Sequence, residues 1–91
     1  MNVKFFATYR DVTRVKQTSI PAQPDIRAML ALLAERYGAT MRAMLYTPDG
    51  TGIGENAIIL VNGRNVQHLG NMDTPLSESD TICVFPMVAG G

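Results

Sequence analysis

Residues 80–91 read DTICVFPMVAGG and join a predicted strand directly to two glycines. The stretch from Thr81 to Phe85 is apolar on both faces of the expected strand, which is typical of strands in the interior of a sheet. The two glycines add nothing to a core and give the chain great conformational freedom, and no polar spacer separates them from the strand. The pattern therefore predicts a rigid strand that presents a tail, residues 86–91, to another molecule.

The tail has one reactive group at its tip, the α-carboxylate of Gly91, which is ionised at neutral pH. Residues 86–91 extend roughly 20 Å at about 3.3–3.6 Å per residue. Because they lack Cβ, Gly90 and Gly91 could thread a partner tunnel that is too narrow for any other residue. We expect Val88, Ala89 and Gly90 to insert into that tunnel and Gly91 to carry the chemistry. A carboxylate is a poor acyl donor until it is activated, usually by ATP-dependent adenylation. The activated carbonyl can then accept sulfur or an amine.

Length and composition indicate a single globular domain over residues 1–91. Of the 91 residues, 46% are hydrophobic and 18% are charged, which is typical of a folded chain. The formal net charge is zero and no basic run exists, which argues against nucleic acid or an anionic membrane as the main partner. The longest apolar run, residues 28–34, is too short to span a bilayer. The first four residues lack the features of a signal peptide, so the expected location is cytoplasmic.

One cysteine and one histidine restrict the site chemistry of the chain itself. A single cysteine excludes an intrachain disulfide, and one cysteine with one histidine cannot build a structural zinc site, so we expect no metal. Cys83 lies in the middle of a strand, where a buried, inert thiol is expected. We also expect a structural role for His68.

The first half of the chain predicts a hairpin followed by a helix. Residues 3–9 and 14–20 have strand character and are joined by a predicted turn at 10–13. Asp25, after Pro24, favours a helix start, and Gly38 is placed to end the helix. Between them lies an apolar stripe at helical spacing: Ile26, Met29, Leu30, Leu33 and Tyr37. Residues 41–46 predict a second short helical turn.

The second half predicts a loop and three strands. The glycines within residues 49–54 precede a strand instead of following one, so we interpret them as a connecting loop and not a nucleotide-binding loop. Residues 57–62 and 80–85 are expected strands of the sheet interior, and residues 64–69 a short strand returning from a turn at Asn62-Gly63. Together these elements predict an α+β fold, a β-grasp (ubiquitin-like) mixed sheet gripping one main helix.

One helix can cover only one face of such a sheet. Because side chains alternate along a strand, Cys83 and Phe85 share the face opposite Ile82 and Val84. Two alternatives remain for the face without the helix. Either the loops over residues 39–56 and 63–79 fold over it, or it is an exposed apolar patch beside the tail that binds a partner. In the second case Phe85, Pro86 and Met87 are the expected partner-binding residues.

Motifs along nearly the whole chain carry a family resemblance. They are FATYRD at residues 6–11, LVNGR at 60–64, DTPL at 73–76 and the closing residues 80–91. In this order the motifs resemble the molybdopterin synthase small subunit (MoaD) family, within the MoaD/ThiS-type ubiquitin-like sulfur carriers. There are two departures from the family pattern. Met87 replaces the second of two prolines, and Ser79 replaces a turn glycine.

The resemblance implies a non-catalytic carrier subunit of a sulfurtransferase, molybdopterin synthase. An adenylyltransferase related to ubiquitin-activating enzymes would use ATP to convert Gly91 to an acyl-adenylate, and a sulfur donor protein would convert that to a thiocarboxylate. The large subunit of molybdopterin synthase would then transfer the sulfur to a pterin precursor in molybdenum cofactor biosynthesis. No cofactor is expected on this chain, because the ATP belongs to the activating partner.

Two alternatives to this function stay open. The first keeps the carrier chemistry and changes the recipient, to thiazole synthesis for thiamin, another sulfur pathway, or conjugation to proteins as a ubiquitin-like modifier. The second is a non-catalytic β-grasp binding module in which the glycines have no role, and it predicts that the tail can be truncated without loss of function.

Overall fold

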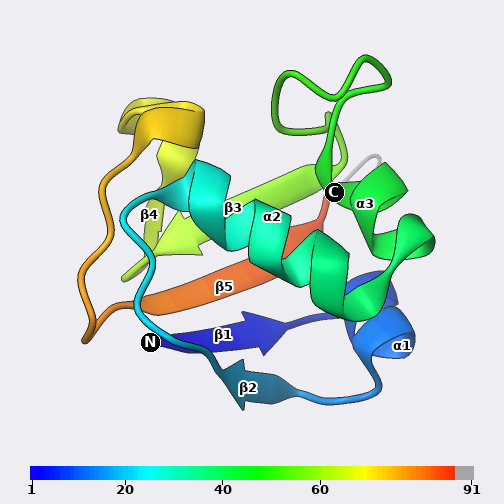
Figure 1. Ribbon diagram of the computed structural model, residues 1–91, viewed down its shortest axis with the longest axis horizontal. Coiled ribbons are helices and arrows are strands. Elements are labelled where there is room, and N and C mark those ends of the chain that lie inside the picture. The colour runs from blue at the N-terminus through cyan, green and yellow to red at the C-terminus, as the bar shows by residue number, and fades with distance from the viewer. Residues whose placement is uncertain (88–91) are drawn as a thin grey trace.

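The computed structural model describes residues 1–87, which form a five-stranded mixed sheet packed on a central helix (Figure 1). The strands lie in the order β2-β1-β5-β3-β4, in which β1 and β5 run parallel and the other neighbours antiparallel. Their bounds are β1 (Asn2–Phe5), β2 (Gln17–Ser19), β3 (Ala57–Val61), β4 (Arg64–Asn65) and β5 (Thr81–Pro86). The helices are α1 (Thr8–Thr13), α2 (Ile26–Tyr37) and α3 (Ala39–Leu45), with 3-10 turns η1 (Val66–His68) and η2 (Asn71–Asp73). This is the β-grasp architecture that the sequence predicts, with β5 at its centre.

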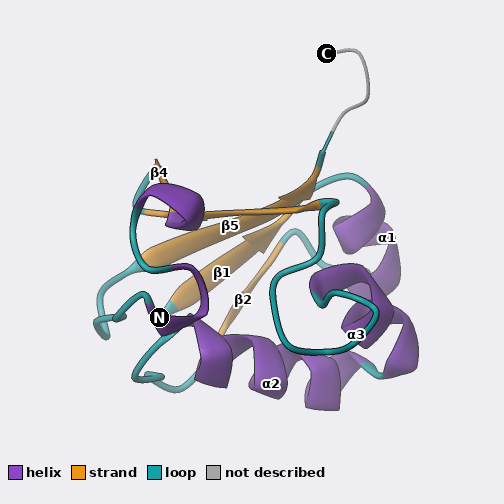
Figure 2. Ribbon diagram, turned by 90° about the horizontal axis from the view of Figure 1, so that it is seen from above, coloured by secondary structure: helices purple, strands orange, loops and turns teal. Residues whose placement is uncertain are grey.

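Helix α2 supplies most of one side of the core and lies across one face of the sheet (Figure 2). Four members of its predicted stripe have no exposed surface: Ile26, Met29, Leu30 and Leu33. The fifth, Tyr37, packs edge-on against Phe5 of β1, with ring centroids 5.7 Å apart. From the sheet, Ile82 and Val84 of β5 are fully buried in the same cluster. The stripe is thus confirmed as the core face of the helix.

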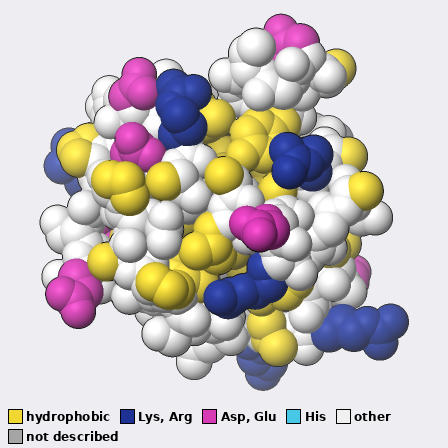
Figure 3. Space-filling view, in the orientation of Figure 1, with side chains coloured by type: hydrophobic (Ala, Val, Ile, Leu, Met, Phe, Trp, Pro, Cys, Tyr) yellow, Lys and Arg dark blue, Asp and Glu magenta, His cyan; other side chains and the backbone are white. Residues whose placement is uncertain are grey.

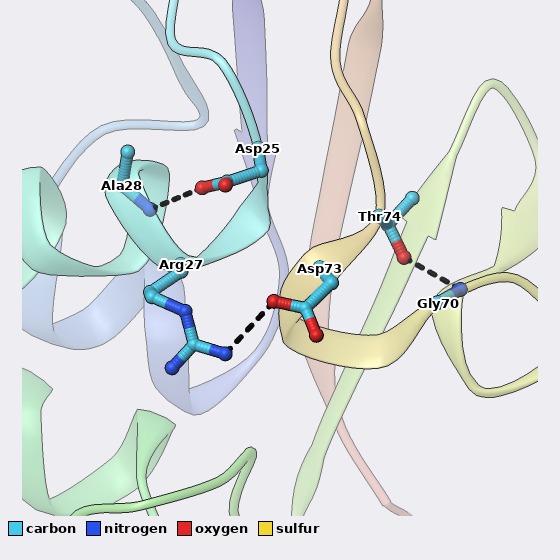
Figure 4. A network of polar contacts seen from close by, with 6 residues as sticks. All are labelled: Asp25, Arg27, Ala28, Gly70, Asp73 and Thr74. Atoms are coloured by element: carbon cyan, nitrogen blue, oxygen red, sulfur yellow. Dashed lines mark hydrogen bonds and ion pairs between the residues drawn. The ribbon is translucent and has the colours of Figure 1, made fainter.

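The start of α2 is tied to the segment that precedes β5 (Figure 4). Asp25 caps the helix, because its Oδ1 accepts a hydrogen bond of 2.9 Å from the amide of Ala28. The amide of Ile26 donates to the carbonyl of Thr74 at 3.1 Å. The Thr74 hydroxyl in turn accepts from the amide of Gly70 at 2.9 Å, and Thr74 is almost fully buried. The DTPL motif therefore fastens the approach to β5 onto the helix.

The predicted N-terminal hairpin is wrong in its connection. Strands β1 and β2 do pair antiparallel, but α1 stands where a turn was expected, and β1 ends at Phe5 instead of continuing to Tyr9. Tyr9 and Thr13, one helical turn apart, are buried in α1, and this burial outweighs the strand propensity of the aromatic residues. Arg14 ends the helix in the left-handed conformation, with φ of 64°.

The predicted strand over residues 64–69 is also too long. Only Arg64 and Asn65 pair with β3, after which the chain forms η1. The side chain of Asn65 caps this turn by accepting a hydrogen bond of 2.9 Å from the amide of Gln67. Val66 enters the core from the turn and is 1% exposed. The 3-10 turn η1, capped by Asn65 and anchored by the buried Val66, thus stands where the rest of the strand was expected.

The face of the sheet opposite α2 is left open by the loops. Of the two alternatives left open, covering by residues 39–56 and 63–79 does not hold, because α3 and η2 pack against α2 on the other side. Cys83 and Phe85 are half-buried there, whereas their neighbours Ile82 and Val84 are buried under the helix. The alternative of an exposed apolar patch is therefore confirmed.

The helix-covered face shows charged side chains of both signs scattered among apolar and polar ones (Figure 3). No helix within residues 1–87 is long and apolar enough to cross a membrane.

Candidate functional site at the root of the tail

Among the described strands, the last two residues of β5 pair only with β3. Phe85 lies opposite Ile58, and Pro86 lies opposite Ala57. Beyond the strand, the amide of Met87 donates a hydrogen bond of 3.0 Å to the carbonyl of Asn56. Proline has no amide hydrogen, so methionine at position 87 adds a bond that the second proline of the family pattern cannot make. Pro86, assigned to the tail from sequence, is the last residue of β5.

The predicted insertion residues Val88, Ala89 and Gly90, and the predicted reactive residue Gly91, lie outside the described residues. The described part of the site consists of the surfaces that flank Pro86 and Met87.

A shallow apolar pocket of about 420 Å³ opens on the helix-free face beside Pro86. We call its lining the root patch: Phe6, Ala7, Leu60, Cys83, Phe85 and Pro86. The rings of Phe6 and Phe85 meet edge to face, with centroids 6.2 Å apart and planes at 89°. Phe6 is 38% exposed. The root patch is therefore a small apolar surface, open to solvent, beside the end of β5.

Arg10 of α1 places a positive charge at the rim of the root patch. Its guanidinium carbon lies 5.9 Å from the centroid of the Phe6 ring, within the range of a cation–π contact. Its Nε donates a long hydrogen bond of 3.4 Å to the carbonyl of Phe5. A partner that covers the apolar patch therefore also meets a guanidinium that is held in place.

A second hollow flanks the other side of Met87. It is a groove of about 1260 Å³ between α1, α3 and the loop that leads to β3. Arg42 on its wall lies over the ring of Tyr46, 5.8 Å from the centroid. The Tyr9 hydroxyl holds α1 to α3 by donating a 2.9 Å hydrogen bond to the carbonyl of Met44. Burial raises the pKa of Tyr9 to about 12, because the phenolate would be poorly solvated there.

The start of β5 is fixed by a polar network on the side away from the tail. Asn62, in the turn after β3, donates a hydrogen bond of 2.8 Å from its Nδ2 to the carboxylate of Asp80. Its Oδ1 accepts a hydrogen bond of 2.9 Å from the amide of Thr81. The other carboxylate oxygen of Asp80 accepts a hydrogen bond of 2.7 Å from the amide of Ser77. Asn62 and Gly63 both have positive φ, as a two-residue hairpin turn requires. The network sets where β5 begins.

The glycine-containing loop over residues 49–54 is an ordered connection into β3. Asp49 Oδ1 accepts hydrogen bonds from the hydroxyls of Thr47 and Thr51 and from the amide of Thr51. These bonds lower the pKa of the Asp49 carboxyl. A Cβ at Gly54 would lie 3.0 Å from the carbonyl oxygen of Tyr46, so glycine is needed for this close approach.

The two single-copy residues have different surroundings. The expectation of a buried thiol at Cys83 is wrong, because strand alternation places it half-buried on the open face, within the root patch. His68 lies exposed on η1. Within residues 1–87 no group of three His, Cys, Asp or Glu side chains is arranged to hold a metal ion.

Sequence reasoning selected Phe85, Pro86 and Met87, and the structure brings all three to the tail root. It missed Phe6, Leu60 and Arg10, which complete the surface around them. A signal was present in the pair Phe5-Phe6, because two consecutive strand residues must face opposite sides of a sheet. If Phe5 is in the core, Phe6 must lie on the open face.

Comparison with known proteins identifies the family. The model of the ThiS family matches residues 3–91. The chain belongs to the ThiS family. This match confirms the predicted resemblance to the MoaD/ThiS-type ubiquitin-like sulfur carriers. Small archaeal modifier protein 3 of Haloferax volcanii is 38% identical over 96 residues, which cover 100% of this chain and 98% of that protein.

Two solved structures show the same fold with moderate sequence identity. The solution structure of small archaeal modifier protein 1 from Methanosarcina acetivorans is 28% identical, with a TM-score of 0.83 over 99% of this chain and 94% of that one. A protein from Pyrococcus furiosus described as a putative molybdopterin converting factor, subunit 1, is 27% identical, with a TM-score of 0.71 over 96% and 95% of the two chains. Proteins similar to this ThiS-family chain thus include two that are named small archaeal modifier proteins and one that is described as a putative molybdopterin converting factor subunit.

Proposed function

We infer that this ThiS-family chain is a ubiquitin-like carrier whose Gly91 carboxyl is activated by a partner and then joined to an amine of a target protein. An adenylyltransferase related to ubiquitin-activating enzymes would use ATP to form the Gly91 acyl-adenylate. The chain itself would supply the tail and the surface that the partner recognises. Such a protein is a substrate of the enzymes that act on it and needs no catalytic group of its own.

The observation that carries this proposal is the root patch. An enzyme that acts on Gly91 must surround the tail and therefore meets the residues on either side of Met87. On one side, Phe6 and Phe85 offer an open apolar pocket with Arg10 at its rim. Because this patch lies on β5 itself, docking there fixes the direction in which the tail leaves the domain.

Protein modification is favoured because the relative at 38% identity is itself named a modifier protein. The second candidate is sulfur transfer, which the structural similarity to a putative molybdopterin converting factor subunit favours. In that case a sulfur donor protein converts the acyl-adenylate to a thiocarboxylate, and the large subunit of molybdopterin synthase receives it. Both candidates need the same activation of Gly91 and differ in the nucleophile that follows.

Intact-mass measurement separates the two candidates. The purified protein is first weighed to establish that Gly91 carries a free carboxylate. It is then incubated with ATP and its cognate activating enzyme, with and without a sulfur donor and a lysate of the source cells. Lysine-linked adducts on other proteins support modification, whereas exchange of one oxygen for sulfur without adducts supports sulfur transfer. An unchanged mass under all conditions contradicts both.

Deletion of Gly91 tests the role of the tail directly. It retracts the carboxylate by about 3.5 Å, which is comparable to the separation of reacting atoms in a near-attack geometry. We expect activation to be lost while the fold stays intact by circular dichroism, because the described core is built from residues between Val3 and Val84. Gly91→Ala keeps the length and tests the width of the tunnel, so it serves as the matched variant. A truncated protein that is still activated would refute the argument from the reach of the tail.

A further inference from the structure

The turn between β3 and β4 joins an asparagine directly to a glycine. Asn62 and Gly63 have positive φ of 50° and 84°, a backbone conformation that favours these two residue types in a two-residue hairpin turn. This is the only Asn-Gly step in the sequence. Each of the other four asparagines precedes a residue with a side chain: Val3, Ala57, Val66 or Met72.

An asparagine before glycine lies next to its own nucleophile, the backbone nitrogen of the glycine. Glycine has no Cβ that would hinder the approach of this nitrogen to the asparagine side chain. Both residues of the turn are exposed, and a Cβ added at Gly63 would meet no atom within 4 Å. The turn is therefore open to water and is not shielded by neighbouring side chains.

The Asn62 side chain is held at both of its polar atoms. Its Nδ2 donates a hydrogen bond of 2.8 Å to Oδ1 of Asp80, and its Oδ1 accepts a hydrogen bond of 2.9 Å from the amide of Thr81. We call these two bonds the Asn62 clamp. For its Cγ to reach the nitrogen of Gly63, the side chain must rotate, and rotation breaks the clamp. The clamp therefore opposes the reaction between the two turn residues.

We propose that Asn62 is a self-modification site that the clamp keeps closed, and that its conversion to a carboxylate irreversibly opens the start of β5. When the side chain rotates, the nitrogen of Gly63 attacks Cγ of Asn62. The new C–N bond forms as the bond from Cγ to Nδ2 breaks, and Nδ2 leaves as ammonia with the electron pair and the amide proton of Gly63. Water then opens the cyclic imide at either of its two carbonyls, which gives aspartate or isoaspartate. No partner is needed, so the proposal is independent of the proposed function.

Either product removes the clamp. Aspartate at position 62 places a carboxylate oxygen where Nδ2 donates to Asp80, so two like charges face each other at hydrogen-bond distance. Isoaspartate adds one carbon to the backbone of the turn, which a two-residue hairpin does not accommodate. The adjacent backbone bond, 2.9 Å from the amide of Asn62 to the carbonyl of Thr81, should open as well. This bond is part of the pairing at the start of β5, so the strand is released there.

Peptide mapping of the full chain during incubation at neutral pH measures the reaction. Trypsin releases residues 43–64, in which conversion replaces NH2 by OH, and chromatography separates the aspartate and isoaspartate forms. The wild type should convert slowly at Asn62, whereas Asn56 in the same peptide should stay unchanged. Asp80→Ala should convert about tenfold faster, as expected from the loss of one hydrogen bond to a charged group. Leu33→Ala, the matched control, weakens the core and leaves the clamp intact, so it should convert at about the wild-type rate.

A second pair of variants tests the consequence for β5. Asn62→Asp reproduces the product and should lower the midpoint of urea unfolding. Adding Asp80→Asn exchanges donor and acceptor across the same contact. The new amide can donate to the new carboxylate, and its oxygen can still accept from the amide of Ser77. The double variant should therefore recover most of the lost midpoint.

Conversion at equal rates in the wild type and Asp80→Ala, or in neither protein, would overturn the proposal. Equal acceleration by Leu33→Ala would also overturn it, because conversion would then follow unfolding of the whole domain. Conversion of Asn56 as fast as Asn62 would have the same force. An unchanged midpoint in Asn62→Asp, or no recovery in the double variant, would overturn the claim that the product opens β5 by charge repulsion.

Discussion

Replacing Tyr9 with phenylalanine should make the protein less stable at neutral pH and more stable at high pH. Tyr9 is 1% exposed, and its hydroxyl donates a 2.9 Å hydrogen bond to the carbonyl of Met44. Phenylalanine keeps the ring and removes only this bond. At pH 7 the free energy of unfolding should therefore fall by about 1 kcal/mol.

The alkaline effect follows from the raised pKa. In the folded protein the pKa of Tyr9 is about 12, whereas an unfolded chain ionises its tyrosines near pH 10. Above pH 10 the unfolded state has lost a proton that the folded state still holds, so stability falls as the pH rises. With a difference of about 2 pKa units, the loss is about 1.4 kcal/mol at pH 11 and approaches about 2.7 kcal/mol above pH 12. The phenylalanine variant lacks this contribution entirely.

Urea unfolding of both proteins at several pH values between 7 and 11.5 measures the effect. The two stability curves should cross just below pH 11, because about 1.4 kcal/mol of linkage then exceeds the hydrogen bond of about 1 kcal/mol. The other tyrosines are present in both proteins, so their contributions cancel in the difference. A difference that stays constant from pH 7 to 11.5 would refute the reasoning, since it would mean that the hydroxyl ionises equally in both states.

Three further substitutions test the core, the start of β5 and the root patch. Leu33→Ala should lower the free energy of unfolding by about 3 kcal/mol through a cavity under the sheet, and Leu69→Ala, at an exposed position, by far less in the same urea titration. Asp80→Ala should cost about 1.5 kcal/mol by leaving the amide of Ser77 and the side chain of Asn62 without their acceptor; an unchanged midpoint would contradict this role. Phe85→Ala should weaken binding to the cognate activating enzyme by about 2 kcal/mol, roughly thirtyfold, in calorimetry. Equal affinity for that variant would exclude the root patch as the docking surface.

The parts of the fold that the sequence predicted are those in which local pattern and tertiary packing agree. The stripe of α2, the helix start at Asp25 and the turn at Asn62-Gly63 each have a strong local signal, and all three are confirmed. The double-sided apolar character of β5 likewise indicated its central place. In these cases the residues that favour the element are also those that the core needs.

The errors lie where tertiary packing overrides a local preference. Aromatic and β-branched residues around Tyr9 favour a strand, but the ring of Tyr9 reaches the core only from a helix that turns away from the sheet. Val66 is drawn into the core in the same way, and β4 ends after two residues. The burial of Cys83 was misjudged for a different reason, because alternation defines two faces and does not say which one the helix covers.

The open face is better explained by binding than by folding. Burying a Phe side chain fully stabilises a fold by about 1.5–3 kcal/mol, yet Phe6 and Phe85 are left partly exposed beside each other. No loop within residues 1–87 is used to cover them, although two long connections are available and both pack on the α2 side. A partner that docks here, as proposed above, would bury the exposed parts of both rings. Since Phe85 lies two residues before Met87, such a partner would lie at the root of the tail.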